Sequence, residues 1–116
     1  MRLGWFRENV AVDEGALLRT AADRLEGLAA RSTPGDWRTG GLLASRPEVF
    51  AHVEDSTEHV AEARARTAAW ISALSPAVGP PLGAWLRATA EAAAVEPAAV
   101  AFARALLERL PPDQPD

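Results

Sequence analysis

The sequence predicts an α+β fold, with a long N-terminal helix, a small antiparallel β-hairpin or sheet, and then three helices around one core. Three observations support this prediction. The 116 residues are 48% hydrophobic and 24% charged, which suits one globular domain with a buried core. Apolar residues recur at spacings of three and four residues in four separate segments, as in amphipathic helices. Between the first two of these segments, apolar and polar residues alternate, as they do in half-buried strands.

The first helix is predicted from Asp13 to Arg31. Asp13 is a suitable N-cap and Glu14 suits the first turn, while Pro34 and Gly35 follow the end. Residues 1–12 carry apolar side chains without a helical period, which predicts an N-terminal arm or a short strand. The apolar stripe of the helix consists of Leu17, Leu18, Ala21, Leu25, Leu28 and Ala29.

The alternating segment lies within residues 36–55. Short runs over Leu42–Ser45 and Val49–Glu54 predict the two strands of a hairpin or meander. An isolated hairpin is marginally stable in water, so we expect a helix to cover its apolar face.

Three further helices follow. Asp55 and Glu58 have the spacing of a capping box, which predicts the start of a second helix that ends at Ser75-Pro76. The third helix is expected from Pro80 or Pro81 to about Ala94, and the fourth from Pro97 to Leu110. These elements predict a single domain over residues 13–110 and a flexible tail over residues 111–116. The predicted inward stripes include Trp70 and Leu74 in the second helix, and Trp85 and Leu86 in the third.

Composition excludes several chemistries. The chain has no cysteine, so disulfides, cysteine metal sites and thiol catalysis are excluded. The net charge of −4 argues against an overall nucleic-acid surface. DNA binding would require a local basic face formed by Arg19, Arg24, Arg64 and Arg66. The sequence shows neither a signal peptide nor a membrane-spanning run, which predicts a cytoplasmic protein without membrane association.

The densest polar cluster surrounds His52 and His59, with Glu54, Asp55, Glu58 and Glu62 nearby. The spacing of these residues matches no strong metal-binding motif. One such motif has two histidines four residues apart with a glutamate between them. General acid–base catalysis by a histidine and a carboxylate is a second hypothesis for this cluster. Nucleophile-elbow and phosphate-loop motifs are absent. The sequence therefore assigns no catalytic, cofactor-binding or metal-ligating residue and predicts no cofactor.

These observations predict a non-enzymatic protein–protein interaction or regulatory module with an unidentified protein partner. The alternative is a small-ligand or metal-dependent enzyme that uses the His52/His59 acidic cluster. A homodimer is also compatible with the sequence, because alanine-rich helices can pack closely and a second copy could bury the aromatic pair Trp5-Phe6. The candidate binding surface consists of Trp5, Phe6, Arg38, His52, Glu54, His59 and Glu62.

Four short motifs carry a resemblance to known proteins. They are the turn Thr33–Trp37, the segment Thr67–Pro76, the run Gly83–Leu86 and the helix end Ala103–Leu107. In this order they resemble a set of small uncharacterised proteins from actinobacteria and their phages. The chain departs from that set at Asp36, at Pro80-Pro81 and in residues 1–12. The resemblance implies no activity, because the matched positions are mainly Pro, Gly, Trp and apolar residues that determine folds.

Overall fold

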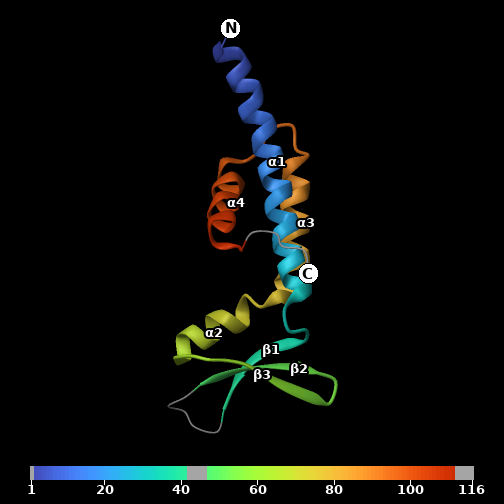
Figure 1. Cartoon of the computed structure of the whole chain (residues 1–116), viewed down its shortest axis with the longest axis vertical. Coiled ribbons are helices and arrows are strands. Elements are labelled where there is room, and N and C mark those ends of the chain that lie inside the picture. Colours follow the sequence, from blue (N-terminus) through green and yellow to red (C-terminus); the bar gives the residue numbers. More distant parts are fainter. Residues whose placement is uncertain (1, 42–46, 112–116) are drawn as a thin grey trace. The chain divides into compact units, whose positions relative to one another are not determined.

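The computed structural model describes the backbone of residues 2–41 and 47–111, and side chains from Glu14 onward within those ranges. The fold is α+β, as predicted: a three-stranded antiparallel sheet and a long N-terminal helix are accompanied by three further helices (Figure 1). The described residues form two compact units. Unit 1 comprises residues up to Gly27 and from Pro80 onward, and unit 2 comprises Leu28–Gly79. The single domain expected over residues 13–110 stays a prediction.

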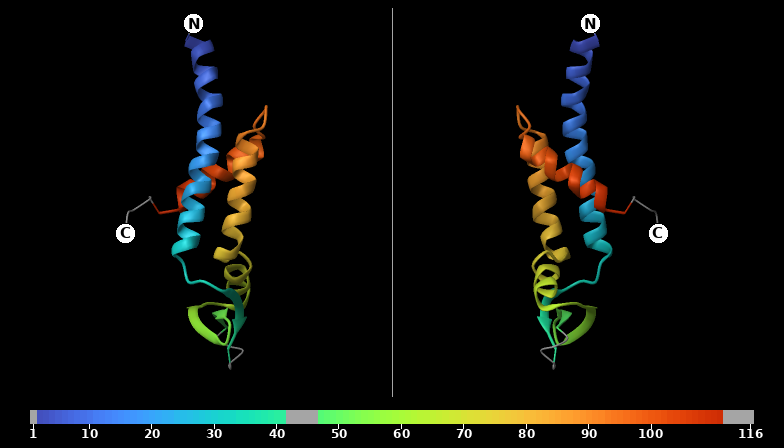
Figure 2. Two further views of the ribbon diagram at one scale, coloured as in Figure 1. Left: turned by 90° about the vertical axis from the view of Figure 1, so that its right-hand side faces the viewer. Right: turned by 90° about the vertical axis from the view of Figure 1, so that its left-hand side faces the viewer.

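Unit 1 is a three-helix assembly. It contains most of helix α1 (Arg2–Arg31) and of α3 (Gly79–Ala90), together with all of α4 (Pro97–Arg109). Helix α3 runs antiparallel beside α1, and α4 crosses both (Figure 2). Five of the seven residues in the buried core cluster are alanines, which allow the helix backbones to approach closely. That cluster consists of Leu18, Ala21, Ala22, Leu86, Ala90, Ala99 and Ala103.

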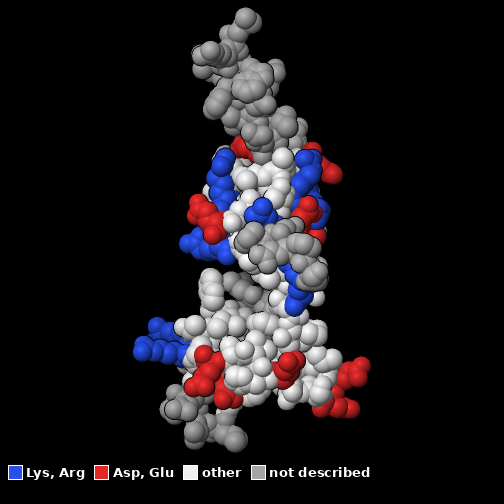
Figure 3. Space-filling model, viewed as in Figure 1, with Lys and Arg blue, Asp and Glu red and all other residues white. Residues whose placement is uncertain are grey.

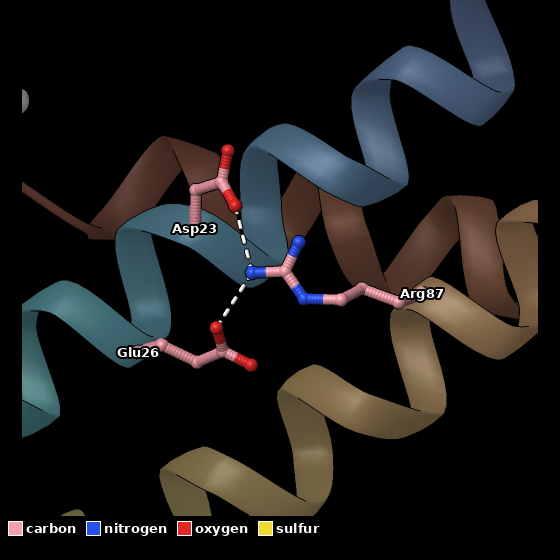
Figure 4. Close-up of polar contacts among 3 residues, drawn as sticks. All are labelled: Asp23, Glu26 and Arg87. Atoms are coloured by element: carbon pink, nitrogen blue, oxygen red, sulfur yellow. Dashed lines mark hydrogen bonds and ion pairs between the residues drawn. The ribbon is translucent and has the colours of Figure 1, made fainter.

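A polar contact links α1 to α3 in unit 1 (Figure 4). Nη2 of Arg87 donates to Oε1 of Glu26 at 2.5 Å and to Oδ1 of Asp23 at 2.7 Å. The hydrogen bonds that Arg87 donates to Glu26 and, with a smaller effect, to Asp23 raise the pKa of Arg87 above its ordinary value. Gly83 makes room for this contact, because a Cβ at this position would overlap the Glu26 side chain. Helix α3 is therefore positioned by the ion pairs of Arg87 as well as by its apolar face.

Unit 2 contains the sheet, in the order β1-β2-β3, with α2 (Ala65–Ala73) and the short 3-10 helix η1 (Pro76–Val78). Strand β1 (Asp36–Gly40) pairs with β2 (Glu48–Val53), which pairs with β3 (Ser56–Glu62). Helix α2 packs against β1 and β2. Val49 and Ala51 of the central strand and Ala68 of α2 are fully or almost fully buried, so they form the apolar contact of this unit.

The turn before β1 depends on Gly35 and Trp37. Gly35 has a φ of 112°, and a Cβ there would lie 2.6 Å from Val53 Cγ2 and 2.7 Å from the His52 carbonyl oxygen. The indole Nε1 of Trp37 donates to the carbonyl of Thr33 at 2.9 Å, which closes the turn. Two residues of the predicted turn motif thus have a structural role.

Several predicted boundaries are wrong. Residues 2–12 are helical in α1 and Asp13 lies within that helix, so neither the short strand nor the N-cap is present, and the N-terminal arm stays a prediction. No proline interrupts residues 2–31, which explains why the helix can continue. The predicted strand Leu42–Ser45 and residues 112–116 of the predicted tail lie outside the described residues. Helix α3 ends at Ala90, four residues earlier than Ala94, whereas α4 matches its predicted span closely.

The largest correction concerns Asp55–Glu58, which were predicted to start a helix. Glu54 and Asp55 form a two-residue turn, and Ser56 to Glu62 continue as β3. The local capping signal is overridden because Thr57 and Val60 are β-branched and because pairing with β2 satisfies the backbone. The helix begins only at Ala65.

Candidate functional site

The sheet of unit 2 has two chemically different faces. Side chains alternate along a strand, so Val49 and Ala51 point to the α2 side, where they are buried. Glu48, Phe50 and His52 therefore point to the opposite side. We call this second surface the outer sheet face, formed by Asp36, Arg38, Glu48, Phe50, His52, Thr57, His59 and Glu62.

The strand register brings four of the predicted binding residues to the outer sheet face. Arg38 of β1 lies opposite Phe50, and His59 of β3 lies opposite the same phenylalanine from the other side. His52 pairs with Thr57 and is thus diagonal to His59. A register shift between Val49 and Phe50 accommodates one extra residue in β3, which places Glu62 opposite Glu48.

The contacts on this face are those of a solvated surface. Arg38 Nε donates to Oδ2 of Asp36 at 2.6 Å, and both side chains are more than half exposed. His59 Nε2 lies 4.0 Å from Oε1 of Glu48, and its ring contacts Phe50 edge-on at a centroid distance of 5.7 Å. Exposed pairs of this kind contribute little to stability or selectivity.

The arrangement provides little basis for metal chemistry. Across residues 14–41 and 47–111, no three His, Asp or Glu side chains are grouped so that they could hold one metal ion. His59 and Glu48 form a pair without a third ligand, whereas a structural zinc site takes four and a catalytic one at least three. A histidine beside a carboxylate can still exchange protons with a bound molecule, so general acid–base catalysis stays a hypothesis for this pair.

The other predicted binding residues lie elsewhere. Glu54 occupies the turn between β2 and β3, where it has a φ of 52°. The backbone of Trp5 and Phe6 belongs to α1, and their side chains lie outside the described residues. Of the arginines considered for DNA binding, Arg19 and Arg24 belong to unit 1 and Arg64 and Arg66 to unit 2, so a single basic face stays a prediction.

Among the side chains that the structure describes, the most exposed large apolar ones lie on α2 and at its end, where the sequence predicted core. Trp70 is 67% exposed and Leu74, at the end of the helix, is 52% exposed. They are four residues apart and thus lie on one side of the helix, together with the exposed Arg66, Thr67 and Ala73. We call these five residues the α2 outer face.

The prediction that Trp70 and Leu74 face inward is wrong, because the smaller Ala68 is the residue of α2 that is buried. Ala68 is fully buried, and Ser72, four residues later, has a buried hydroxyl without a hydrogen-bond partner among the described residues. Alanine and serine allow α2 to lie close to the sheet, and this orientation turns Trp70 outward. The pairing of small residues at i and i+4 was the sequence signal that could have indicated this face.

A second tryptophan, in unit 1, is also more exposed than predicted. Trp85 of α3 is 43% exposed and its ring lies 5.9 Å from that of Phe102 on α4. The neighbouring Leu86 is fully buried, so the predicted inward stripe is confirmed at Leu86. It is wrong at Trp85, one residue earlier, which is exposed.

No protein family, curated protein or solved structure matches this chain significantly. The resemblance to small actinobacterial and phage proteins therefore stays a prediction. Among the residues that the structure describes, no helix combines the length and the apolar character needed to cross a membrane.

Proposed function

We propose that this chain is a non-enzymatic protein–protein interaction or regulatory module and that it works in the cytoplasm, as the sequence predicts. The observation that carries the proposal is the exposure of Trp70 and Leu74 on the α2 outer face. Tryptophan is enriched at protein interfaces, and it contributes much of their binding energy once a partner removes it from water. Two large apolar side chains one helical turn apart are suitable anchors for a partner.

The enzyme alternative receives less support from the same structure. A catalytic group needs a fixed position and an environment that tunes its proton affinity. His52 and His59 are exposed, and His59 has a long polar contact with Glu48 and an edge-on ring contact with Phe50. The outer sheet face therefore offers polar groups for recognition rather than an organised reaction centre.

The proposal can be tested by placing a photo-crosslinking amino acid on the α2 outer face in living cells. We choose Ala73, because it is exposed and lies on the same side of α2 as Trp70. We expect discrete crosslinked proteins from this position, and we expect Trp70→Ala to abolish them. Thr57, which is exposed on the outer sheet face, is the matched control position. Crosslinks that arise only at Thr57, or that persist in Trp70→Ala, would refute the proposal.

The substitution Trp70→Ala is also expected to leave the fold intact. An exposed residue contributes little to stability, so the free energy of unfolding should change by less than about 0.5 kcal/mol. If Trp70 were in the core, as its position in the sequence suggested, the loss would be about 3–5 kcal/mol. Urea denaturation of the wild type and the variant distinguishes these values, and Leu18→Ala, at a fully buried position, provides the destabilised reference.

A further inference from the structure

The size of the α2 outer face limits what it can bind. The α2 outer face has five residues, on a helix of 9 residues that is about 13 Å long at about 1.5 Å per residue. A stable interface between two folded proteins contains roughly 20–30 residues on each partner. This face is therefore too small to hold a second copy of the chain by itself, and it matches a short segment of one or two helical turns.

The charges at the start of α2 are basic, whereas the strands of unit 2 carry acidic residues together with Arg38, which pairs with Asp36. Arg64 precedes α2 and Arg66 lies in its first turn, and α2 itself contains no acidic residue. All six acidic residues of unit 2 lie in the strands or in the Glu54-Asp55 turn. Figure 3 shows one group of basic side chains at the end of this unit where α2 begins, and acidic side chains over the strands.

Arg64 and Arg66 are exposed and have no ion-pair partner among the described residues. Arg66, Trp70 and Leu74 follow one another at four-residue intervals, which places one cation and two apolar groups in a row along the helix. A complementary ligand has two apolar side chains spaced by one helical turn and a carboxylate beyond them. A second copy could not supply that carboxylate from its own α2, because this helix has none.

From these observations we infer that the α2 outer face binds a short, acidic, amphipathic segment of a partner protein. The apolar side chains of the segment pack on Trp70 and Leu74, and its carboxylates approach Arg64 and Arg66. This inference rests on the proposed function, since it specifies the chemistry of the partner.

The test is a selection of random 12-residue peptides displayed on phage, with the full-length protein as bait and its Trp70→Ala variant for counter-selection. We expect enriched peptides with two apolar residues three or four positions apart and at least two acidic residues. A synthetic enriched peptide should bind Trp70→Ala about 30-fold or more weakly than the wild type, as for an aromatic anchor.

Charge reversal provides the specific readout. Selection against the double variant Arg64→Glu/Arg66→Glu should enrich basic peptides in place of acidic ones. The matched control is Arg104→Glu, which reverses an exposed arginine on α4 and should leave the acidic preference unchanged. The inference is overturned if no peptide is enriched, if enriched peptides are not acidic, or if charge reversal leaves their composition unchanged.

Two further measurements test whether a second copy of the chain or a membrane, instead of an acidic segment, covers the α2 outer face. Self-association in sedimentation equilibrium that Trp70→Ala abolishes would show that a second copy covers the face, and would overturn the inference. Binding to phosphatidylserine vesicles that depends on Trp70 and Arg66 would overturn it in favour of a membrane. If crosslinking at Ala73 succeeds in cells while the selected peptides are not acidic, the proposed function stands and only this inference fails.

Discussion

At the scale of single residues, Gly35 occupies a position before β1 that strongly favours glycine. Its φ of 112° is rarely accessible to other residues, and a Cβ would collide with the backbone of His52 and with Val53. We expect Gly35→Ala to reduce the free energy of unfolding by about 2–4 kcal/mol, because neither backbone nor side chain can relax cheaply. Thermal and urea denaturation would measure the loss.

The matched control for Gly35 is Gly40→Ala in the neighbouring strand β1. A Cβ at Gly40 would lie 3.2 Å from the Phe50 ring, which needs only a small shift. This substitution should cost less than about 1 kcal/mol. Equal losses for the two variants would mean that the positive φ of Gly35 is not the cause.

Glu54 presents the opposite case, since a residue with a side chain occupies a position that favours glycine. Its φ of 52° lies in the left-handed region, which costs an L-residue about 1–2 kcal/mol. Glycine at this position removes the cost, but it also raises the conformational entropy of the unfolded chain, which cancels part of the gain. Glu54→Gly should therefore stabilise the protein by roughly 0.5–1 kcal/mol. The substitution Glu54→Ala keeps the strain and removes the charge. Stabilisation by Glu54→Ala to the same extent would show that charge, and not φ, is responsible.

At the scale of secondary structure elements, the sequence predicted what local periodicity determines. The apolar stripe around Leu18 and Ala21 and the helix after Pro97 are present as expected. The local capping signal favoured a helix at Asp55–Glu58, but pairing with β2 makes Ser56–Glu62 a strand. That choice depends on contacts across the sheet, which a short sequence window does not contain.

The candidate site was predictable in part. His52 and His59 share a face because the two-residue turn sets the register, and one extra residue in β3 after His59 then brings Glu62 to the same face. Neither could be inferred once β3 had been taken for a helix. The outward orientation of Trp70 was missed because hydrophobicity alone assigns a tryptophan to the core, whereas the packing is decided by the small Ala68.

The contact between α1 and α3 yields a prediction at the same scale. Gly83 lies within a helix, where alanine is normally favoured by about 0.5–1 kcal/mol, yet its Cβ would overlap the Glu26 side chain that contacts Arg87. We expect Gly83→Ala to give no stabilisation in the wild type and about 0.5–1 kcal/mol of stabilisation in a Glu26→Ala background. A double-mutant cycle by urea denaturation measures this difference. Equal effects of Gly83→Ala in both backgrounds would show that Glu26 does not constrain this position.

At the scale of the whole molecule, the two units have unequal cores. In unit 1 a cluster of seven buried residues joins three helices, including the large Leu18 and Leu86. In the described part of unit 2, the sheet and α2 fully or almost fully bury Val49, Ala51 and Ala68, and these three side chains bury less apolar surface than the seven of the unit 1 cluster. Local stability follows the apolar area that a segment buries, so unit 2 should open at a lower free energy than unit 1.

Native-state hydrogen exchange tests this difference at two amides, Ala51 in the central strand and Leu86 in α3. We expect the opening free energy at Ala51 to be lower than that at Leu86 by at least about 1 kcal/mol. Val49→Ala should lower protection at Ala51 and leave Leu86 unchanged, because the cavity it creates lies within unit 2. Leu18→Ala should do the reverse, at a cost of roughly 2–5 kcal/mol to unit 1. If either substitution lowers protection at both amides equally, the two units unfold as one cooperative structure and their cores are not energetically separate.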